Sequence, residues 1–283
     1  MRKFILLLIL AALVGNVQAA SGTLKRIADS GEIKIGYRAA TEPFSFQDSA
    51  GQATGYSVEL CQRIAEAVRT ELKLKELKVT YVPVTLEERF DAVAKKKVDM
   101  VCSATTITLS RLEKVDFSLL TFVTGGSLMS RSSAPIGMTS DLAGKKVAVI
   151  SGTTTETGLA DYLKENFIDA STVAAENIEA ARKLLDEGQV DAVADDQIVL
   201  IGQIIASGAP DDYTLSQDLY SYEPYGLALA RDDADFRLVA DRTLARIYRT
   251  GQFKPLYSKW FGRFGLKPTP ILQAMYALQG LPE

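Results

Sequence analysis

The stretch Val98-Asp-Met-Val-Cys-Ser-Ala-Thr-Thr-Ile-Thr-Leu-Ser-Arg111 decides the fold that we expect for this chain. Its first five residues, 98–102, form a short apolar run typical of a buried strand. Hydroxyl side chains and one arginine follow at once. In open parallel sheets, ligands bind beyond the carboxyl ends of the strands. The stretch therefore predicts an α/β fold with half of an anion site at this strand end, the alternative being a Ser/Thr turn with a surface arginine.

A second copy of the same design favours the anion site. Residues 90–102 and 182–194 both show an amphipathic helix pattern, a polar stop and a Val-Asp-x-Val strand. Thr85 is expected to cap the first of these helices. The first copy ends in hydroxyls and an arginine, whereas the second ends in two carboxylates, Asp195 and Asp196. The two copies predict two α/β lobes whose strand ends carry opposite charges.

The first residues have the pattern of an export signal. Arg2 and Lys3 precede an apolar run, 4–14, that is too short to span a bilayer, and residues 17–19 resemble a small-residue cleavage site. We therefore expect residues 1–20 to be a signal peptide and the mature protein to be periplasmic. No cysteine follows the cleavage point, so a lipid anchor is not expected. The alternative is a core helix at the start of the fold.

The charge of the mature chain restricts its partners. Removing the two basic residues of the signal from 32 Lys+Arg leaves 30 against 35 Asp+Glu, a net charge of 30 − 35 = −5. This excess of acid argues against nucleic acid or an anionic membrane as a partner. The length suits two domains, and no later segment has the pattern of a membrane helix.

The chain has two cysteines and no histidine. A zinc site or a histidine-based triad cannot be built from these residues, and we expect neither a metal nor a cofactor. In an exported protein, two cysteines suggest a disulfide. Cys61 lies on the apolar stripe of a predicted helix, and Cys102 ends the strand that such a helix would cover. A Cys61–Cys102 bridge is expected, with two buried free thiols as the alternative.

Changes in composition mark two crossings between the lobes. A polar stretch at 131–135 follows one apolar strand, and an aromatic stretch at 220–226 precedes another. We expect 21–130 and 225–283 to form one lobe and 131–224 to form the other. Two strands would then join the lobes, which makes a hinge with the ligand cleft between them.

Taken together, these patterns resemble the periplasmic polar-amino-acid-binding proteins of ABC importers, which form bacterial solute-binding protein family 3. The resemblance rests on Ile35-Gly, Gly55-Tyr-Ser-Val-Glu-Leu60, Val98-Asp with Thr105-Thr and Arg111, Ser151-Gly-Thr-Thr154, and Asp191-Ala-Val with Asp196. These motifs follow the family's order over nearly the whole mature chain and are most similar to the glutamate/aspartate-binding type. The resemblance implies a two-lobed periplasmic-binding-protein-like fold that closes on a free amino acid and hands it to a permease.

The resemblance also implies a role for each candidate site residue. Arg111 would hold the ligand α-carboxylate as a bidentate partner, with Thr106 and Thr154 beside it. Asp196 would bind the α-ammonium together with the main-chain carbonyl of Ala104, a position where many relatives carry serine or glycine.

Arg38 is the candidate specificity residue. In similar proteins this position faces the ligand side chain, and the glutamate/aspartate binders carry an arginine there. Two cations, Arg38 and Arg111, with one carboxylate, Asp196, would give a site that complements a ligand with two carboxylates and one ammonium. A neutral ligand would leave a buried charge unpaired, which is costly. The alternative is that Arg38 pairs with Glu42 or faces solvent. Some glutamate/aspartate binders have a second-lobe histidine, which this chain lacks.

The main prediction is a monomeric periplasmic receptor, not an enzyme, that delivers a free L-amino acid, most favourably glutamate or aspartate, to an ABC-type permease. One rival is a receptor for glutamine or asparagine. Another is a cyclohexadienyl-type dehydratase, which would need a general acid such as Glu156, Asp195 or Glu223 in the cleft. Loss of the amine-binding carboxylate would favour the enzyme, but Asp196 is present. A sensory domain, the last rival, would normally precede a transmembrane segment, and none is seen.

Overall fold

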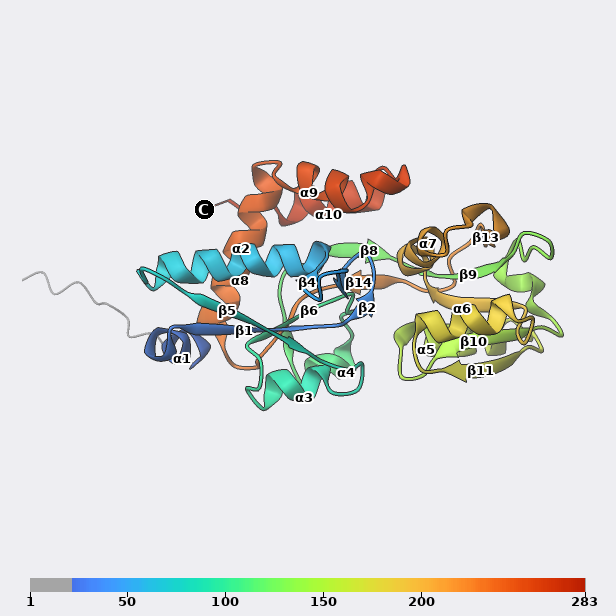
Figure 1. Ribbon diagram of the computed structural model, residues 1–283, viewed down its shortest axis with the longest axis horizontal. Helices are drawn as coiled ribbons and strands as arrows, with labels where there is room; N and C mark the ends of the chain where they lie inside the picture. The colour runs from blue at the N-terminus through green and yellow to red at the C-terminus, as the bar shows by residue number, and fades with distance from the viewer. Residues whose placement is uncertain (1–21, 283) are drawn as a thin grey trace, which may run out of the picture.

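The computed structural model describes residues 22–282, and the predicted signal peptide, 1–20, lies outside this range. Two five-stranded sheets, one in each lobe, are joined by a pair of antiparallel strands (Figure 1). This is the expected α/β fold with two lobes and a two-strand hinge. Among the described residues, no helix combines the length and the apolar character needed to cross a membrane.

The first-lobe sheet has mixed strand directions. Its order is β5 (Lys78–Pro83), β1 (Glu32–Tyr37), β6 (Met100–Cys102), β15 (Ala228–Leu229) and β7 (Asp116–Phe117). β1 pairs in parallel with β5 and β6, whereas β15 pairs antiparallel with β6 and β7. The chain therefore returns from the second lobe into the first sheet. A small sheet follows β1 and consists of β2 (Ala40–Thr41), β3 (Ser45–Gln47) and β4 (Ala53–Thr54).

Helices bury both faces of this sheet. α2 (Tyr56–Glu71), α8 (Ala234–Arg249), α9 (Phe253–Trp260) and α10 (Pro270–Gln279) share one core with β1 and β6, and α3 (Arg89–Ala94) covers a second core. In α2, Cys61, Ile64 and Val68 recur every three or four residues and are fully buried, the spacing of a core-facing helix stripe. A short helix, α4 (Leu109–Leu112), follows the turn after β6.

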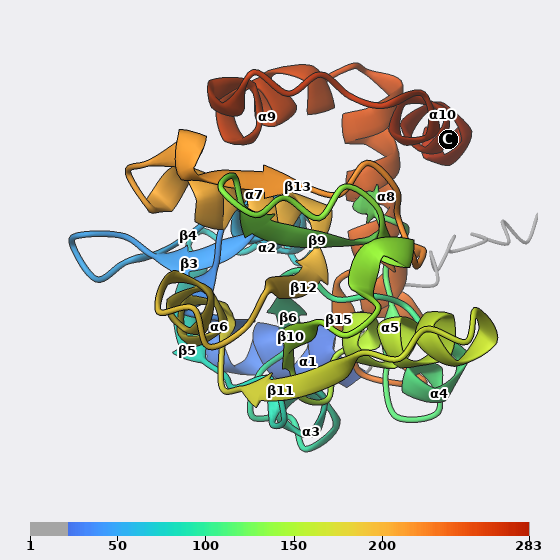
Figure 2. The ribbon, with the colours of Figure 1, turned by 90° about the vertical axis from the view of Figure 1, so that its right-hand side faces the viewer.

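The second lobe is a three-layer sandwich. Its sheet has the order β11 (Ser171–Ala175), β10 (Lys146–Ile150), β12 (Ala192–Asp196), β9 (Gly126–Arg131) and β13 (Tyr213–Leu215). Figure 2 shows α5 (Thr154–Glu165) on one side of this sheet and α6 (Ile178–Asp186) with α7 (Gln197–Ala206) on the other. The two faces have separate apolar cores. Short 3-10 helices lie at Thr139–Leu142, Pro210–Asp212 and Gly262–Phe264.

The hinge consists of β8 (Phe122–Thr124) and β14 (Glu223–Tyr225). β9 begins at Gly126 and pairs along its length with β12, so it belongs to the second sheet. The boundary expected after residue 130 is therefore wrong by one strand. The apolar run 121–129 is divided at Gly125, where an added Cβ would lie 2.4 Å from the Ser221 carbonyl oxygen. The return crossing lies in β14, which pairs antiparallel with β8.

The expected disulfide is present. Cys61 of α2 is bonded to Cys102 at the end of β6, with the two Cα atoms 6.4 Å apart. Both residues are fully buried. The bridge fastens α2 to the strand that leads into the hydroxyl-rich turn, and so it holds the edge of the first sheet where the candidate site residues lie.

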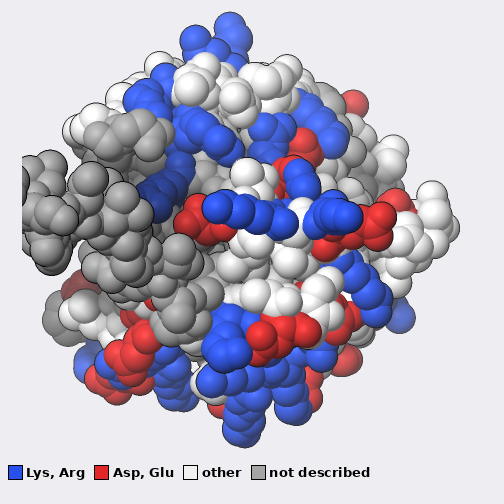
Figure 3. Space-filling model, turned by 90° about the vertical axis from the view of Figure 1, so that its left-hand side faces the viewer, with Lys and Arg blue, Asp and Glu red and all other residues white. Residues whose placement is uncertain are grey.

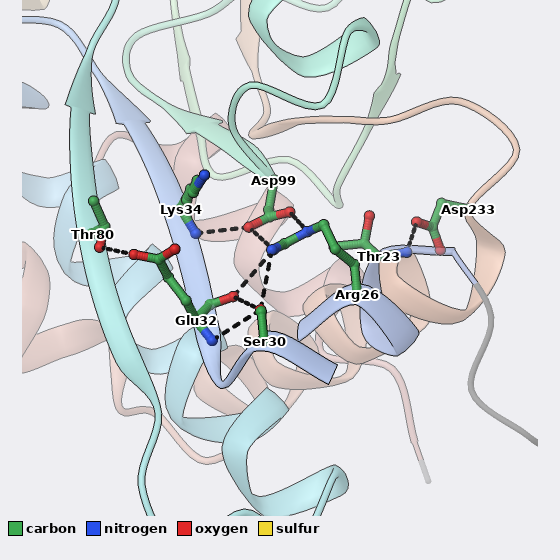
Figure 4. A network of polar contacts seen from close by, with 8 residues as sticks. All are labelled: Thr23, Arg26, Ser30, Glu32, Lys34, Thr80, Asp99 and Asp233. Atoms are coloured by element: carbon green, nitrogen blue, oxygen red, sulfur yellow. Dashed lines mark hydrogen bonds and ion pairs between the residues drawn. The ribbon is translucent and has the colours of Figure 1, made fainter. Parts of the chain in front are cut away.

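The N-terminal helix, α1 (Gly22–Ser30), is anchored to the first lobe by a polar network (Figure 4). Asp99 accepts hydrogen bonds from Arg26 Nε at 3.0 Å and from the Lys34 main chain at 2.7 Å, and Asp233 accepts one from the Thr23 main chain at 2.7 Å. Figure 3 shows basic and acidic side chains interspersed over the visible part of this end of the molecule. Exposed pairs of this kind, such as Lys25 with Asp29, add little stability.

The C-terminal helix α10 packs against α8 and the hinge strand β8. Gln279 Oε1 accepts a hydrogen bond from the Leu120 main chain at 2.7 Å. The Tyr276 hydroxyl lies 3.0 Å from that of Tyr56, which donates to the Thr121 carbonyl at 3.0 Å. The chain segment that leads into β8 is therefore held firmly on the first lobe.

Candidate ligand-binding cleft

A pocket between the two lobes contains all six side chains predicted for the site. The first lobe contributes one wall, which includes the turn after β6. The second lobe contributes the other wall, from the end of β12 and the starts of α5, α6 and α7. The predicted residues that line it are Arg38, Ala104, Thr106, Arg111, Thr154 and Asp196. Its boundary also includes Arg89 and Asp195, with Leu86 and Ile178 among the apolar residues.

Parallel pairing brings the first-lobe residues together. Tyr37 of β1 is the register partner of Cys102 of β6. Arg38 follows the first strand and Ala104 lies just beyond the second, so both reach the carboxyl edge of the sheet, where ligands of such sheets bind. At position 104, alanine leaves only main-chain groups for polar contact.

Arg111 is fixed by the turn that precedes it. Thr108 is the N-cap of α4, and its Oγ1 accepts a hydrogen bond from the Arg111 main chain at 3.1 Å. The Arg111 guanidinium donates through Nη1 to the Thr106 carbonyl at 2.7 Å and lies 5.4 Å from the centre of the Phe90 ring. Burial lowers the pKa of Arg111, while Glu223 and then Asp196 oppose this shift. Among the described residues, the Thr106 carbonyl is the one hydrogen-bond acceptor found for this guanidinium, so its other N–H groups can serve an anion.

Arg89 is a third cation in the pocket, which the sequence reasoning missed. Its side chain is 4% exposed, donates to the Leu86 carbonyl, and lies 4.3 Å from the centre of the Phe90 ring. Within the described structure its Nε has no hydrogen-bond partner. Burial, followed by the charges of Arg111 and Arg38, lowers the pKa of Arg89 to about 9. A buried cation with an unused donor is a candidate ligand for an anion.

The sequence carried a weak signal for Arg89. It lies three residues after Leu86 on the predicted helix, and spacing of three or four places residues on one buried stripe. The structure differs at the start of this helix, because α3 begins at Arg89 and Thr85 caps only the preceding turn, accepting from the Glu88 main chain at 3.2 Å. The late start places Arg89 in the first turn, beside the cleft.

The second-lobe wall begins at the N-terminus of α5. Thr153 is the N-cap and accepts a hydrogen bond from the Glu156 main chain at 3.1 Å. The first N–H groups of a helix have no partner within it and attract anions. Thr154, the first helical residue, therefore brings both a hydroxyl and a main-chain donor to the pocket. Asn177, as expected, caps α6.

Two carboxylates end β12 on the same wall. Asp196 is 9% exposed, accepts a hydrogen bond from the Tyr225 hydroxyl through Oδ2, and has no partner for Oδ1 within the described part of the chain. Burial, then the charges of Asp195 and Glu223, raise its pKa. Burial also raises the pKa of Asp195 to about 7, against the hydrogen bond from the Asp196 main chain and the attraction of Arg38.

Arg38 lines the pocket, so it is not simply a solvent-facing residue. Burial lowers its pKa, and the strongest opposing attraction comes from Asp195, followed by Glu87 and Glu179. The charge count from the sequence omitted Arg89, Asp195 and the nearby hinge residue Glu223. The second-lobe wall also includes Ile178, an apolar residue that adds no charge to the pocket.

Comparisons with known proteins agree with this architecture. The family described as "Bacterial extracellular solute-binding proteins, family 3" matches residues 33–263. The L-glutamate/L-aspartate-binding protein of Pseudomonas aeruginosa is 35% identical over 242 residues, covering 85% of this chain and 80% of that protein. The glutamate/aspartate import solute-binding protein of Escherichia coli is 30% identical over 243 residues, covering 86% of this chain and 80% of that protein.

A solved structure shares the fold. The crystal structure of AncCDT-1, an ancestral amino acid-binding protein and precursor of cyclohexadienyl dehydratase, superposes with a TM-score of 0.73 at 30% identity. The match covers 85% of this chain and 100% of that chain. Similar proteins thus include two named as glutamate/aspartate-binding proteins and one described as the precursor of a dehydratase.

Proposed function

Since this chain belongs to family 3 of the bacterial extracellular solute-binding proteins, we propose that it is a periplasmic receptor for a free acidic L-amino acid, glutamate or aspartate, that delivers its ligand to an ABC-type permease. One observation carries the choice of ligand. Arg38 and Arg89 line the same pocket as Arg111 and Asp196, so the pocket has two cations beyond the pair that any amino acid needs.

The common part of the ligand would bind at the junction of the lobes. Arg111 and the first N–H groups of α5 are donors for the α-carboxylate, and Thr106 and Thr154 lie beside them. Asp196 would accept from the α-ammonium through its unpartnered Oδ1, together with the Ala104 carbonyl. These contacts do not distinguish one amino acid from another.

The ligand side chain would then lie toward Arg38 and Arg89. A second carboxylate there neutralises buried positive charge, whereas an amide does not, and an unpaired buried charge costs several kcal/mol. Asp195 offsets part of the positive charge, which would allow a neutral ligand to bind. A receptor for glutamine or asparagine is therefore the alternative that the experiment below must distinguish from a receptor for an acidic amino acid.

The proposed mechanism is a shift toward the closed state. Thr106 of the first lobe lies 3.2 Å from Thr154 of the second, oxygen to oxygen. A ligand that contacts both walls binds strongly only when they are together, and its differential affinity for that state drives closure.

We propose no dehydratase activity. Glu156 accepts a hydrogen bond from the Gly152 main chain at 2.8 Å, and both Glu223 oxygens accept from hydroxyls. In these contacts Glu156 and Glu223 accept hydrogen bonds from the protein itself, and neither side chain is among the residues that line the pocket. Asp195 is the remaining acid of the three, but the amine-binding carboxylate Asp196 also lines this pocket.

Isothermal titration calorimetry of the mature chain against glutamate, aspartate, glutamine and asparagine tests the proposal. We expect micromolar or tighter dissociation constants for an acidic ligand and at least tenfold weaker binding of its amide. Tight binding of glutamine or asparagine with weak binding of both acids would overturn the ligand class. Failure of the properly folded protein to bind any of the twenty amino acids would overturn the receptor proposal.

A further inference from the structure

Glu223 on the hinge strand β14 contacts both lobes. It is 1% exposed. Its Oε2 accepts hydrogen bonds from the hydroxyls of Thr106 and Thr154, each at 2.6 Å, and its Oε1 accepts from the Ser221 hydroxyl at 2.7 Å. Thr106 lies on the first-lobe wall of the cleft and Thr154 on the second-lobe wall. One buried carboxylate therefore joins three parts of the molecule.

The hydrogen-bond pattern defines Glu223 as an acceptor. A hydroxyl has one proton to donate. The Ser221 oxygen already accepts from the Gly126 main chain at 3.0 Å, and its proton is directed to Glu223. Among residues 22–282, no salt bridge includes Glu223. Hydroxyl donors, rather than a paired cation, satisfy this carboxylate.

The same pattern fixes what the two threonines present to the pocket. When Thr106 and Thr154 donate to Glu223, their hydroxyl oxygens remain as acceptors and their protons point away from a ligand carboxylate. Donors to that carboxylate are then the Arg111 guanidinium and the main-chain N–H groups at the start of α5. Glu223 thus sets the direction of the site hydroxyls without itself lining the pocket.

The bridge also depends on the positions of the lobes. Thr154 moves with the second lobe, whereas Thr106 stays with the first, so one Glu223 oxygen can hold both hydroxyls only when the walls meet. Given the proposed receptor function, on which this inference rests, we propose that Glu223 is a positioning residue whose bridge between Thr106 and Thr154 strengthens binding of every amino acid ligand by stabilising the closed state.

The variant Glu223→Gln tests this role, because it keeps the size of the side chain and replaces one acceptor oxygen with a donor. Hydrogen bonds to charged groups contribute more than neutral ones, and we expect affinity for glutamate and for glutamine to fall by a similar factor, about tenfold or more. Small-angle scattering at saturating glutamate should give the wild-type closed dimensions, whereas at a fixed subsaturating concentration the variant should be more open.

Two further variants separate positioning from a general loss of structure. Ser221→Ala removes the hydroxyl that lies within the hinge and leaves both lobe contacts, and we expect less than about a threefold change. In a double-mutant cycle with Thr154→Val, the Glu223→Gln and Thr154→Val effects should be strongly non-additive, since both remove the same bridge. If Glu223→Gln does not fold, Glu223→Asp replaces it in the test. The shorter aspartate side chain keeps the charge but cannot reach both threonines. This variant should therefore also bind amino acids more weakly.

The outcomes separate this inference from the receptor proposal. If the wild-type protein binds no amino acid, the receptor proposal fails. If the wild type binds but folded Glu223→Gln or Glu223→Asp binds equally well, the bridge has no role in closure. Additive effects in the cycle, or a loss confined to acidic ligands, would also overturn the inference.

Discussion

The two walls of the cleft carry opposite charges. The first-lobe wall contributes the three arginines Arg38, Arg89 and Arg111, whereas the second-lobe wall contributes Asp195 and Asp196. Burial, followed by the charges of Arg111 and Arg38, lowers the pKa of Arg89, and burial, followed by the charges of Asp195 and Glu223, raises the pKa of Asp196. Like charges therefore repel within each wall, whereas the two walls attract each other across the cleft. We expect this division of charge between the lobes to favour closure.

Removing the shared anchor should give the largest effect. Arg111→Met removes the guanidinium and keeps most of the apolar stem over Phe90. Breaking a buried ion pair by removing one partner costs about 3–5 kcal/mol, so calorimetry should show affinity for all amino acids falling by about a hundredfold or more. A drop limited to acidic ligands would show that Arg111 is not the α-carboxylate partner. Thr108→Ser, which keeps the cap on α4, is the matched control.

The two remaining arginines should produce a smaller and selective effect. Arg38→Met and Arg89→Met should each weaken the binding of glutamate or aspartate by about ten- to a hundredfold. This is the range expected for one charged hydrogen bond of about 1.5–3 kcal/mol. The affinity for glutamine should fall much less, because glutamine brings no second charge. Competition binding of the two ligands gives the ratio directly. An equal loss of affinity for glutamate and glutamine would show that Arg38 and Arg89 do not select acidic ligands.

The smallest effect should come from pH, through the second wall. The pKa of Asp195 is raised to about 7, so its neutral form dominates below pH 7 and its charged form above. A charged Asp195 attracts Arg38 and repels an acidic ligand. Affinity for glutamate should therefore decrease severalfold from pH 6 to pH 8, with a smaller change for glutamine. Asp195→Asn should flatten this dependence, and a rise in glutamate affinity with pH would contradict the assignment.

Local sequence patterns were enough to predict much of this site. The apolar strand 98–102 with its following hydroxyls, and its second copy ending in Asp195 and Asp196, predict polar side chains at two strand ends. Parallel pairing of β1 with β6 then brought Arg38 and Ala104 to one edge. The disulfide, expected because Cys61 lies on a helix stripe and Cys102 ends a strand that such a helix would cover, is present in the structure.

Features decided by distant contacts were not predictable. Residues 121–129 look like one apolar strand, and only pairing of β9 with β12 divides them at Gly125. The position of Arg89 in the pocket could not be predicted, because helix α3 begins at Arg89 and not directly after Thr85, as the capping pattern suggests. The sequence indicates Glu223 only as a candidate general acid, because its neighbours along the chain do not reveal the three hydroxyls that donate to it from separate parts of the fold.

Helix α10 lies beyond residue 263, where the family match ends. It nevertheless holds the approach to the first hinge strand through Gln279 and Tyr276. A helix outside the matched range 33–263 thus supports the chain just before the first hinge strand. We expect a shortened C-terminus to loosen that segment without removing any residue that lines the pocket.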